Sequence, residues 1–410
     1  MSIEKPVASG DTVSSGKRAR RAAAGRPSLP EGFQRQVSRF PVASRPAIRA
    51  LVRKVPLAAD LAHVFPGLLH AIASRHGSEA QRDACLAMLE RGAQLKIIAK
   101  TLDLPMWLRR LPPEVFVRDL SHLPLSDSFA RRVQNRVPAR PADCVSWLES
   151  VRFANRAAGE DLALWIARQR SACHSLDAEW RLGLLAAYAW YSRNPLEDAH
   201  RLIWSRWRSE MSLETAVCAS KSWFNRILLL IHLPQNRPID PWLSAMTLDT
   251  FSFVPLTSAE ALLAESRAMN NCADQYAMAI ASDRCRLFSV RREGMRVATL
   301  EITPHIRERG AFAIAQLKAN CNVPAGLDVW QATYRWMAEQ PRLLDAATLA
   351  TGVRSEPDED VWNQVFGGYR SLHDGAPWIP SKPTIVSIRN IELGLAALAR
   401  DCAIRSWLFT

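Results

Sequence analysis

Apolar side chains recur every three or four residues through most of residues 51–233. At residues 61–72 the stripe contains Leu61, Leu68 and Ile72, and Gly77 ends the segment. Such spacing puts the apolar side chains on one face of a helix, which must pack against other helices. Further helices are predicted on the same grounds at residues 79–99, 161–169, 177–193, 195–210 and 213–233. The pattern therefore predicts a large helical domain.

The helix at residues 195–210 is predicted from its first residues. Asn194 can cap a helix, Pro195 suits the first turn, and Glu197 stands at the third position. An Asn cap accepts hydrogen bonds from the opening amides, and Pro loses nothing where no amide bond is needed. We therefore expect a helix to begin at Pro195.

The pattern changes after residue 250, where one helix is followed by strands. Thr257 and Glu260 have the spacing of a capping box, and an apolar helical stripe follows. Cys272 and Tyr276 lie four residues apart and are expected to share a helix face. The Asn270–Asn271 pair is expected to kink this helix or to divide it in two, because Asn competes for backbone hydrogen bonds.

Three strands follow this helix. Residues 287–291 and 296–302 are rich in side chains that suit a pleated surface, and polar and apolar side chains alternate over residues 312–318. Glu293 and Gly294 lie between the first two strands as a candidate two-residue turn. That turn predicts a register with three facing pairs: Arg292 with Met295, Val290 with Val297, and Arg286 with Glu301. A helix at residues 329–338 is expected to pack on the sheet.

The predicted fold class is α+β, with a large all-helical N-terminal domain followed by a small antiparallel-sheet plus helix domain. A chain of 410 residues is long for one core, so more than one domain is expected. Residues 352–383 collect Gly, Pro and acidic residues and are predicted to be mostly loop, whereas residues 391–408 have the pattern of a closing helix. The predicted divisions are a basic disordered arm at residues 1–45, the helical domain at 46–245, the α+β domain at 246–345, and a loop-rich segment with the C-terminal helix at 346–410.

The net charge of +13 is concentrated near the N-terminus. Residues 1–60 hold twelve Lys or Arg and four Asp or Glu, a net charge of +8. This segment is rich in Ser, Gly, Ala and Pro and includes Lys17, Arg18, Arg20 and Arg21. Such a segment has too little apolar surface to fold alone. It is either an arm that binds the phosphates of nucleic acid or a merely solubilising extension.

Several classes of function lack their sequence signals. The eight cysteines are scattered, with no Cys-x-x-Cys, and no Gly-rich phosphate-binding loop occurs. No apolar run approaches the length that a membrane-spanning helix needs, and no secretory leader is evident. We therefore expect a reduced, cytoplasmic protein with no membrane association, cofactor or metal site.

Polar side chains recur inside the otherwise apolar helix and strands after residue 250, and they are the best candidates for a functional site. We expect them to form a polar groove beside the helix that binds a phosphate or nucleotide-like ligand. The predicted ligand-binding residues are Asn271, Tyr276, Glu301, Gln316, Lys318 and Asn322. In the alternative interpretation, Glu301 and Lys318 are ordinary strand residues that face solvent.

Two other chemistries compete for this stretch. Cys272 is a weak candidate nucleophile, alongside Glu301 and Lys318 as candidate catalytic residues, but it has no neighbouring His to act as a base. A zinc site would have to combine ligands at spacings that match no common pattern, namely Cys272, Cys285, Cys321 and His305. The polar groove is therefore preferred.

These residues also carry a family resemblance. The order is Met269, Cys272 and Tyr276, then a basic strand, then residues 298–302 (Ala-Thr-Leu-Glu-Ile), and finally a Gln-x-Lys-x-x-x-Asn segment from Gln316 to Asn322. This ordered set resembles the PcfJ-like family, which is named after a protein encoded on a conjugative plasmid and is associated with mobile genetic elements. The resemblance covers roughly residues 253–339.

Two positions depart from the family pattern. A His commonly precedes the Cys, and here Asn271 stands there; a Gly commonly follows the basic residue of the third strand, and here it is Ala319. The first departure weakens any mechanism that needs a His–Cys pair, because Asn takes up no proton near neutral pH.

The resemblance implies an accessory protein of a mobile genetic element or plasmid, with a role in conjugation. Such a protein would bind nucleic acid, DNA in particular, or protein partners in the processing and transfer machinery. The alternative is an enzyme that acts on nucleic acid or a nucleotide-like ligand at the groove around Glu301 and Lys318. A second carboxylate beside Glu301, able to share a metal ion, would favour the enzyme.

Overall fold

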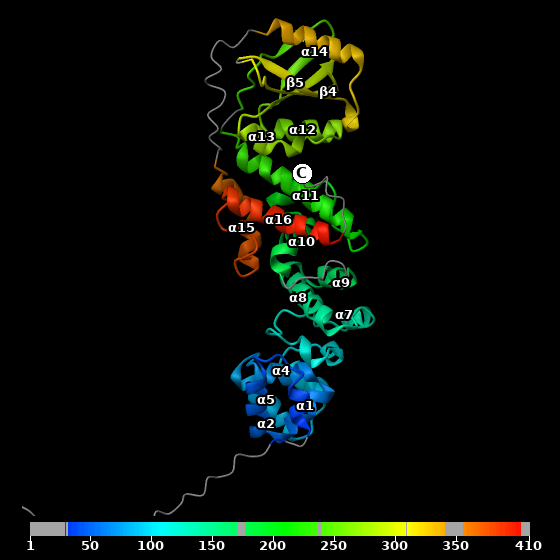
Figure 1. The fold of residues 1–410 in the computed structure, drawn as a ribbon, viewed down its shortest axis with the longest axis vertical. Helices are drawn as coiled ribbons and strands as arrows, with labels where there is room; N and C mark the ends of the chain where they lie inside the picture. The colour runs from blue at the N-terminus through cyan, green and yellow to red at the C-terminus, as the bar shows by residue number, and fades with distance from the viewer. Residues whose placement is uncertain are drawn as a thin grey trace, which may run out of the picture.

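The computed structural model describes residue 29 and residues 32–169, 177–236, 239–308, 310–340 and 356–402. The helices stack into an elongated body, and the sheet lies at the end opposite to the first helices (Figure 1). The predicted α+β class is confirmed: a helical region precedes a five-stranded antiparallel sheet with helices on both of its sides. No helix in the described part of the chain is both long and apolar enough to cross a membrane.

The first helices are shorter than the apolar stripes predicted. The stripe at residues 61–72 is divided by Pro66, which lacks an amide hydrogen and starts a new helix. The stripe at residues 79–99 is interrupted at Gly92, whose φ of 71° is left-handed. The helices are α1 (Phe33–Val37), α2 (Arg45–Lys54), α3 (Leu61–Val64), α4 (Pro66–Ala73), α5 (Glu79–Glu90), α6 (Leu95–Thr101) and α7 (Asp127–Val133), with 3-10 helices η1 (Pro56–Asp60), η2 (Met106–Arg110) and η3 (Pro113–Val115).

Helix α1 corrects the predicted extent of the disordered arm. Phe33, Val37 and Phe40 are at most 2% exposed and belong to the main hydrophobic core. The prediction that residues 1–45 lack structure is therefore wrong from Phe33 onward. The basic composition of this segment suggests disorder, although the segment contains these three apolar side chains at helical spacing.

Four helices form the middle of the molecule: α8 (Pro141–Ala158), α9 (Glu160–Arg168), α10 (Ala178–Arg193) and α11 (Leu213–His232). The helix predicted at residues 195–210 is wrong, and a short 3-10 helix, η5 (Asp198–Leu202), stands there instead. The side-chain Nδ2 of Asn194 donates backward to the Trp190 carbonyl (2.7 Å) rather than capping a new helix. The chain therefore folds back over the end of α10.

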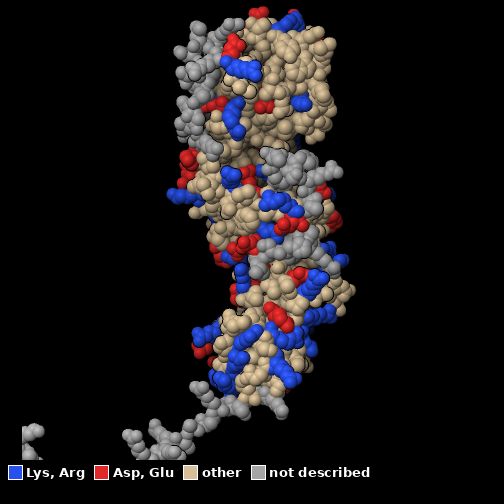
Figure 2. All heavy atoms as spheres, viewed as in Figure 1, with Lys and Arg blue, Asp and Glu red and all other residues tan. Residues whose placement is uncertain are grey.

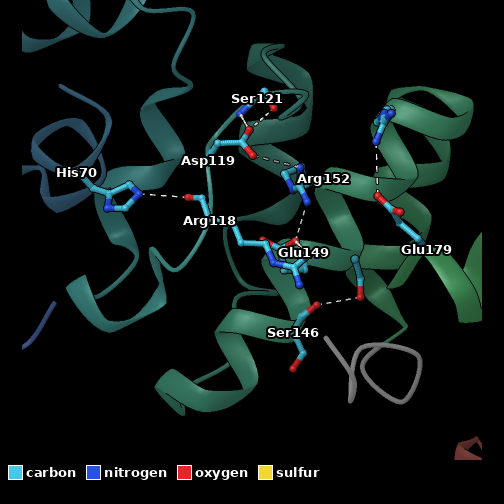
Figure 3. Close-up of polar contacts among 10 residues, drawn as sticks. His70, Arg118, Asp119, Ser121, Ser146, Glu149, Arg152 and Glu179 are labelled. Carbon is cyan, nitrogen blue, oxygen red and sulfur yellow. Dashed lines mark hydrogen bonds and ion pairs between the residues drawn. The ribbon is translucent and has the colours of Figure 1, made fainter. Parts of the chain in front are cut away.

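A polar network with a buried carboxylate joins the first helices to α8 (Figure 3). Glu149 on α8 is 4% exposed, and it accepts a hydrogen bond of 2.8 Å from Arg152 and lies 3.5 Å from Arg118 Nη1. The Arg118 carbonyl oxygen lies 3.1 Å from His70 Nε2, and burial lowers the pKa of His70. These contacts fix the segment after η3 between α4 and α8.

The C-terminal helices α15 (Glu359–Leu372) and α16 (Ile385–Asp401) complete the helical core. The prediction that residues 352–383 are mostly loop is wrong for α15. Gly367 and Gly368 suggest a loop in sequence, but both lie inside α15. Gly394 lets α16 approach the backbone of α10 at Trp180.

The sheet contains β1 (Met246–Leu248), β2 (Phe251–Pro255), β3 (Arg286–Arg292), β4 (Met295–Pro304) and β5 (Phe312–Lys318), paired antiparallel in that order. The three predicted strands correspond to β3, β4 and β5. Their predicted turn is confirmed, because Arg292 pairs with Met295, and Glu293 and Gly294 both have positive φ.

The rest of the predicted β3–β4 register is wrong. The register shifts between Val290 and Arg291, so Val290 pairs with Ala298, and Arg286 pairs with Ile302 rather than Glu301. A β-bulge places an extra residue on one strand and re-aims its neighbours. The guanidinium of Arg286 is used elsewhere, in bonds to Asp283 and to three backbone carbonyls.

The two faces of the sheet differ in chemistry. One face holds apolar side chains such as Phe253, Phe288 and Leu300, which pack against α14 (Leu327–Glu339) through Trp336. This helix was predicted at residues 329–338. The other face is covered by α12 (Ala259–Met269), 3-10 helix η6 (Ala273–Gln275) and α13 (Ala277–Ala281), and these lie between the sheet and α11 (Figure 1).

The predicted helix beside the sheet is divided in two. Asn270 is left-handed (φ 44°) and ends α12, which is one of the two outcomes expected of the Asn pair. The cap of α12 is Ser258, which accepts from the Ala261 amide, rather than Thr257. Cys272 and Tyr276 flank η6 and so do not share an α-helical face.

Candidate functional site

The candidate site lies on the sheet face beneath η6. Glu301 on β4 pairs with Gln316 on β5, and Thr299 pairs with Lys318. Because side chains alternate along a strand and paired residues point the same way, these four side chains share one face. The β5 strand is followed by the 3-10 helix η7 (Asn320–Asn322), which adds Asn322 at the edge of the sheet.

All six predicted ligand-binding residues line one pocket. Asn271 and Tyr276 come from the segment around η6, Glu301 from β4, and the others from β5 and η7. Residues that the sequence did not single out as ligands complete the wall, namely Cys272, Ala273, Leu287 and Thr299. The free volume is about 20 Å³, which is close to the space of one water molecule. A ligand of nucleotide size would place one small group in the pocket, and the rest would lie across its mouth.

Tyr276 and Glu301 form the central hydrogen bond of the pocket. The Tyr276 hydroxyl donates to Glu301 Oε2 over 2.9 Å. Burial raises the pKa of Tyr276, and the neighbouring Glu301 carboxylate raises it further. The hydroxyl therefore keeps its proton and remains a donor. Among the described residues Glu301 Oε1 accepts no hydrogen bond, and this oxygen is open to a ligand donor.

Lys318 is half-buried in the same pocket but does not pair with Glu301. The lack of a pair is notable because a buried charge without a partner is costly. Glu301 lies opposite Gln316, so Lys318 is its diagonal neighbour, and diagonal positions are about 7–8 Å apart. In the described part of the chain no ion pair of Lys318 is found. Its ammonium group is therefore available to an anion.

A buried relay holds Asn271 in place. Asn271 Nδ2 donates to Thr299 Oγ1, and Thr299 Oγ1 donates to Glu265 Oε1, each over 2.8 Å. Glu265 on α12 is fully buried and also accepts from Arg296 Nε over 2.8 Å. At its other end, Asn271 Oδ1 accepts from the Ala273 amide (3.1 Å). Both ends of the amide are engaged, so Asn271 fixes the turn onto the sheet.

A buried ion pair holds the same turn from the opposite side. Asp274 in η6 lies 3.0 Å from Arg226 Nη1 on α11, and the two side chains are 6% and 4% exposed. The Arg226 guanidinium also stacks on Trp204 at 4.0 Å. Burial raises the pKa of Asp274, although Arg226 opposes that shift. The helical region therefore anchors the pocket wall.

The backbone at η7 is strained next to the pocket. Cys321 and Asn322 have left-handed φ values of 57° and 59°, which are uncommon for residues other than Gly. Asn270 Nδ2 lies 3.2 Å from Cys321 Sγ, and Cys272 Sγ lies 4.0 Å from Asn322 Oδ1. Strain of this kind persists only where the surroundings enforce it and is common at functional sites.

The thiol chemistries receive no support from the geometry. Burial raises the pKa of Cys272, and no His lines its pocket, so the thiolate is disfavoured. His305 is exposed beyond β4, where its Nδ1 accepts from the Glu308 amide. Burial raises the pKa of Cys285 to about 12. Within the described ranges, no three or more Cys, His, Asp or Glu side chains are grouped to hold a metal ion.

The sequence missed the residues that support the site. Glu265 had a usable signal, because it stands three residues after Leu262 and four before Met269, on the buried stripe of α12. Arg226 and Asp274 gave no comparable signal, since their pairing joins distant parts of the chain. The predicted arm residues Lys17, Arg18, Arg20 and Arg21 lie outside the described residues.

The chain thus combines a helical region with an α+β unit whose sheet carries a polar pocket on one face. A family model described as PcfJ-like protein matches residues 196–326, so this part of the chain is similar to the PcfJ-like family. The matched segment begins well before the residues on which the resemblance rested and includes η5 and α11 as well as every pocket residue. Neither a curated protein nor a solved structure matches the chain.

Proposed function

We propose that this protein is an accessory protein of a mobile genetic element or plasmid that binds nucleic acid or its processing and transfer machinery. The family match supports the association with mobile elements. Protein partners of such a transfer complex are part of the proposal. The nucleic-acid part is carried by one observation, the distribution of charge along the chain.

The whole net charge of +13 lies in the first 140 residues. Residues 1–60 carry +8, and residues 61–140 carry twelve basic and seven acidic side chains, a net +5. Residues 141–410 hold 29 of each and are neutral. Nucleic-acid binding is driven by cations that neutralise phosphates, so a basic end on a neutral body favours this class of partner.

Binding of the full chain to nucleic acid at low and moderate salt tests the proposal. We expect affinity to fall steeply with salt, and to fall further when Lys17, Arg18, Arg20 and Arg21 are replaced by Ala. Removing phosphate contacts lowers the salt dependence by about 0.9 in log–log slope for each contact with duplex DNA. A full chain that binds no nucleic acid even at low salt would contradict this part of the proposal.

The pocket favours a second candidate, an enzyme acting on nucleic acid or a nucleotide-like ligand. Glu301 Oε1 and Lys318 would contact the ligand, and Asn271, Gln316 and Asn322 would orient it. However, Glu301 is the one carboxylate among the pocket-lining residues, and the nearby Glu265 and Asp274 are held by Arg296 and Arg226. The accessory role therefore leads.

Incubation with end-labelled single strands, duplex, RNA or nucleoside triphosphates, each with Mg²⁺, tests the enzyme. A product made by the natural chain and abolished by both Glu301→Gln and Lys318→Met would support it. If the natural chain makes no product with any of these probes, the enzyme is rejected and the accessory role is the remaining candidate.

A further inference from the structure

Two hollows adjoin on the surface between α6, η2 and α7. Their volumes are about 360 and 460 Å³, and both are lined by Met106, Trp107, Asp127 and Ala130. Because they share these residues, they are neighbours, and we call the two together the basic groove. The floor is mainly apolar, with Leu104, Pro105, Leu125, Val133 and Val137 adding to the shared residues.

The rim of the basic groove is cationic. Lys96 and Lys100 stand one turn apart on α6, Arg110 ends η2, and Arg131 lies on α7. All four side chains are exposed, and none of them forms an ion pair in the part of the chain that the structure describes. Two carboxylates, Asp103 and Asp127, also line the groove, so its net charge is +2.

The charge of the groove continues over the surrounding helices. Residues 32–140 hold eighteen Lys or Arg and eight Asp or Glu. Figure 2 shows that Lys and Arg side chains gather over these N-terminal helices, whereas charges of both signs are mixed over the middle of the molecule. The field around the groove therefore attracts a polyanion.

An apolar floor with a cationic rim matches the chemistry of a single strand of nucleic acid. Its phosphates can pair with the four cations. Its unpaired bases have flat apolar faces, which lose their contact with water when they pack on the apolar floor. A duplex offers the same phosphates but keeps its base faces stacked inside. We propose that the basic groove binds single-stranded nucleic acid, an inference that rests on the proposed nucleic-acid function and names its form and its surface.

The test uses the full chain and fluorescence anisotropy with labelled dT20, rU20 and a 20-base-pair duplex. The groove variant carries Lys96→Gln, Lys100→Gln, Arg110→Gln and Arg131→Gln. The matched control carries Arg168→Gln, Arg307→Gln, Arg389→Gln and Arg400→Gln, four exposed arginines from the neutral part of the chain. A Lys96→Gln, Lys100→Gln double variant replaces the groove variant if circular dichroism shows lost helix.

We expect the groove variant to bind dT20 or rU20 at least tenfold more weakly than the natural chain, with a shallower salt dependence. The control should remain within about twofold. Tighter binding of dT20 identifies the strand as DNA, and tighter binding of rU20 identifies it as RNA; both support the groove.

Equal losses in the two variants would overturn the inference while leaving nucleic-acid binding intact. So would equal affinity of the natural chain for the duplex and the single strands. Tighter binding of an acidic amphipathic peptide than of either strand would make the groove a protein-docking site instead. No binding of any nucleic acid by the natural chain would refute the proposed function itself.

Discussion

The hydroxyl of Tyr276 donates to Glu301 Oε2 over 2.9 Å and so ties the turn around η6 to the middle of the sheet. The bond joins a residue beside a short 3-10 helix to a residue on a central strand, 25 positions away in sequence. It also decides which Glu301 oxygen a ligand can reach. The pocket therefore depends on this contact for its shape and for its chemistry.

Replacing Tyr276 with Phe should lower the free energy of unfolding by about 1–2 kcal/mol, because a half-buried carboxylate loses its donor. Urea denaturation at pH 7 measures this change. Since the pKa of Tyr276 is raised in the folded state, its contribution is complete below the unfolded value of about 10 and is lost as the pH rises above it. The natural chain should therefore lose stability more steeply above pH 10 than Tyr276→Phe does. Equal slopes would show that Tyr276 is not the group responsible.

Changes to Glu301 and Lys318 should separate function from stability. Either residue replaced by Ala should abolish the activity or binding of the pocket. Lys318→Ala should change the free energy of unfolding little, and Glu301→Ala should cost no more than the loss of about 1–2 kcal/mol expected for Tyr276→Phe, because both of those changes remove the same hydrogen bond. Met269→Ala and Leu300→Ala should instead cost about 2–5 kcal/mol, because both side chains are at most 2% exposed. Denaturation of all four variants checks the contrast. If Glu301→Ala were as destabilising as Leu300→Ala, Glu301 would have a structural role.

Breaking the ion pair between Arg226 and Asp274 should be strongly destabilising. Arg226→Met leaves a buried carboxylate without its partner and is expected to cost about 3–5 kcal/mol. The matched control is Arg267→Met, an exposed arginine 6.0 Å from the same Trp204 ring, which should change stability by less than about 0.5 kcal/mol. Similar losses in both variants would show that stacking on Trp204, rather than the ion pair, provides the stability.

Replacing Thr299 with Val should loosen the turn without removing bulk from the core. The change deletes the hydroxyl that accepts from Asn271 and donates to Glu265, at an expected cost of about 1–3 kcal/mol. Because Asn271 then loses its anchor, the Ala273 amide that bonds to Asn271 Oδ1 should exchange its hydrogen faster. Hydrogen exchange of that amide, compared with an amide inside α14, measures the effect. Unchanged exchange at Ala273 would mean that the turn is held by other contacts.

Strand alternation was enough to predict which polar side chains would meet. Side chains alternate between the two faces along each strand, so residues on adjacent strands can be assigned to one face from spacing alone. The pairing of β4 with β5 brings together Glu301, Gln316 and Lys318 in this way. The predicted pairing of Arg286 with Glu301 is wrong because the register shifts between Val290 and Arg291, and the alternation of side chains does not reveal such a shift. Whether these residues bind a ligand stays a prediction.

The pairing of buried charges could not be predicted from the sequence. The stripe of α12 marks Glu265 as buried, but neither Glu265 nor Asp274 reveals its partner, because Arg296 and Arg226 come from other elements. The same applies to Gly394 on α16, whose missing side chain is required only because the backbone of α10 at Trp180 packs against it. Such features follow from tertiary contacts and cannot be read from spacing alone.

The double anchoring of the turn bears on where the chain could be cut. Asp274 faces α11 and Asn271 faces the sheet, so a fragment that started near residue 246 would carry the pocket residues but leave Asp274 without its counter-ion. The segment matched by the family model starts at residue 196 and contains Arg226. The smallest fragment that keeps this pocket intact is therefore expected to include α11 as well as the sheet. A transfer of the site to another protein, by evolution or by design, would need both parts.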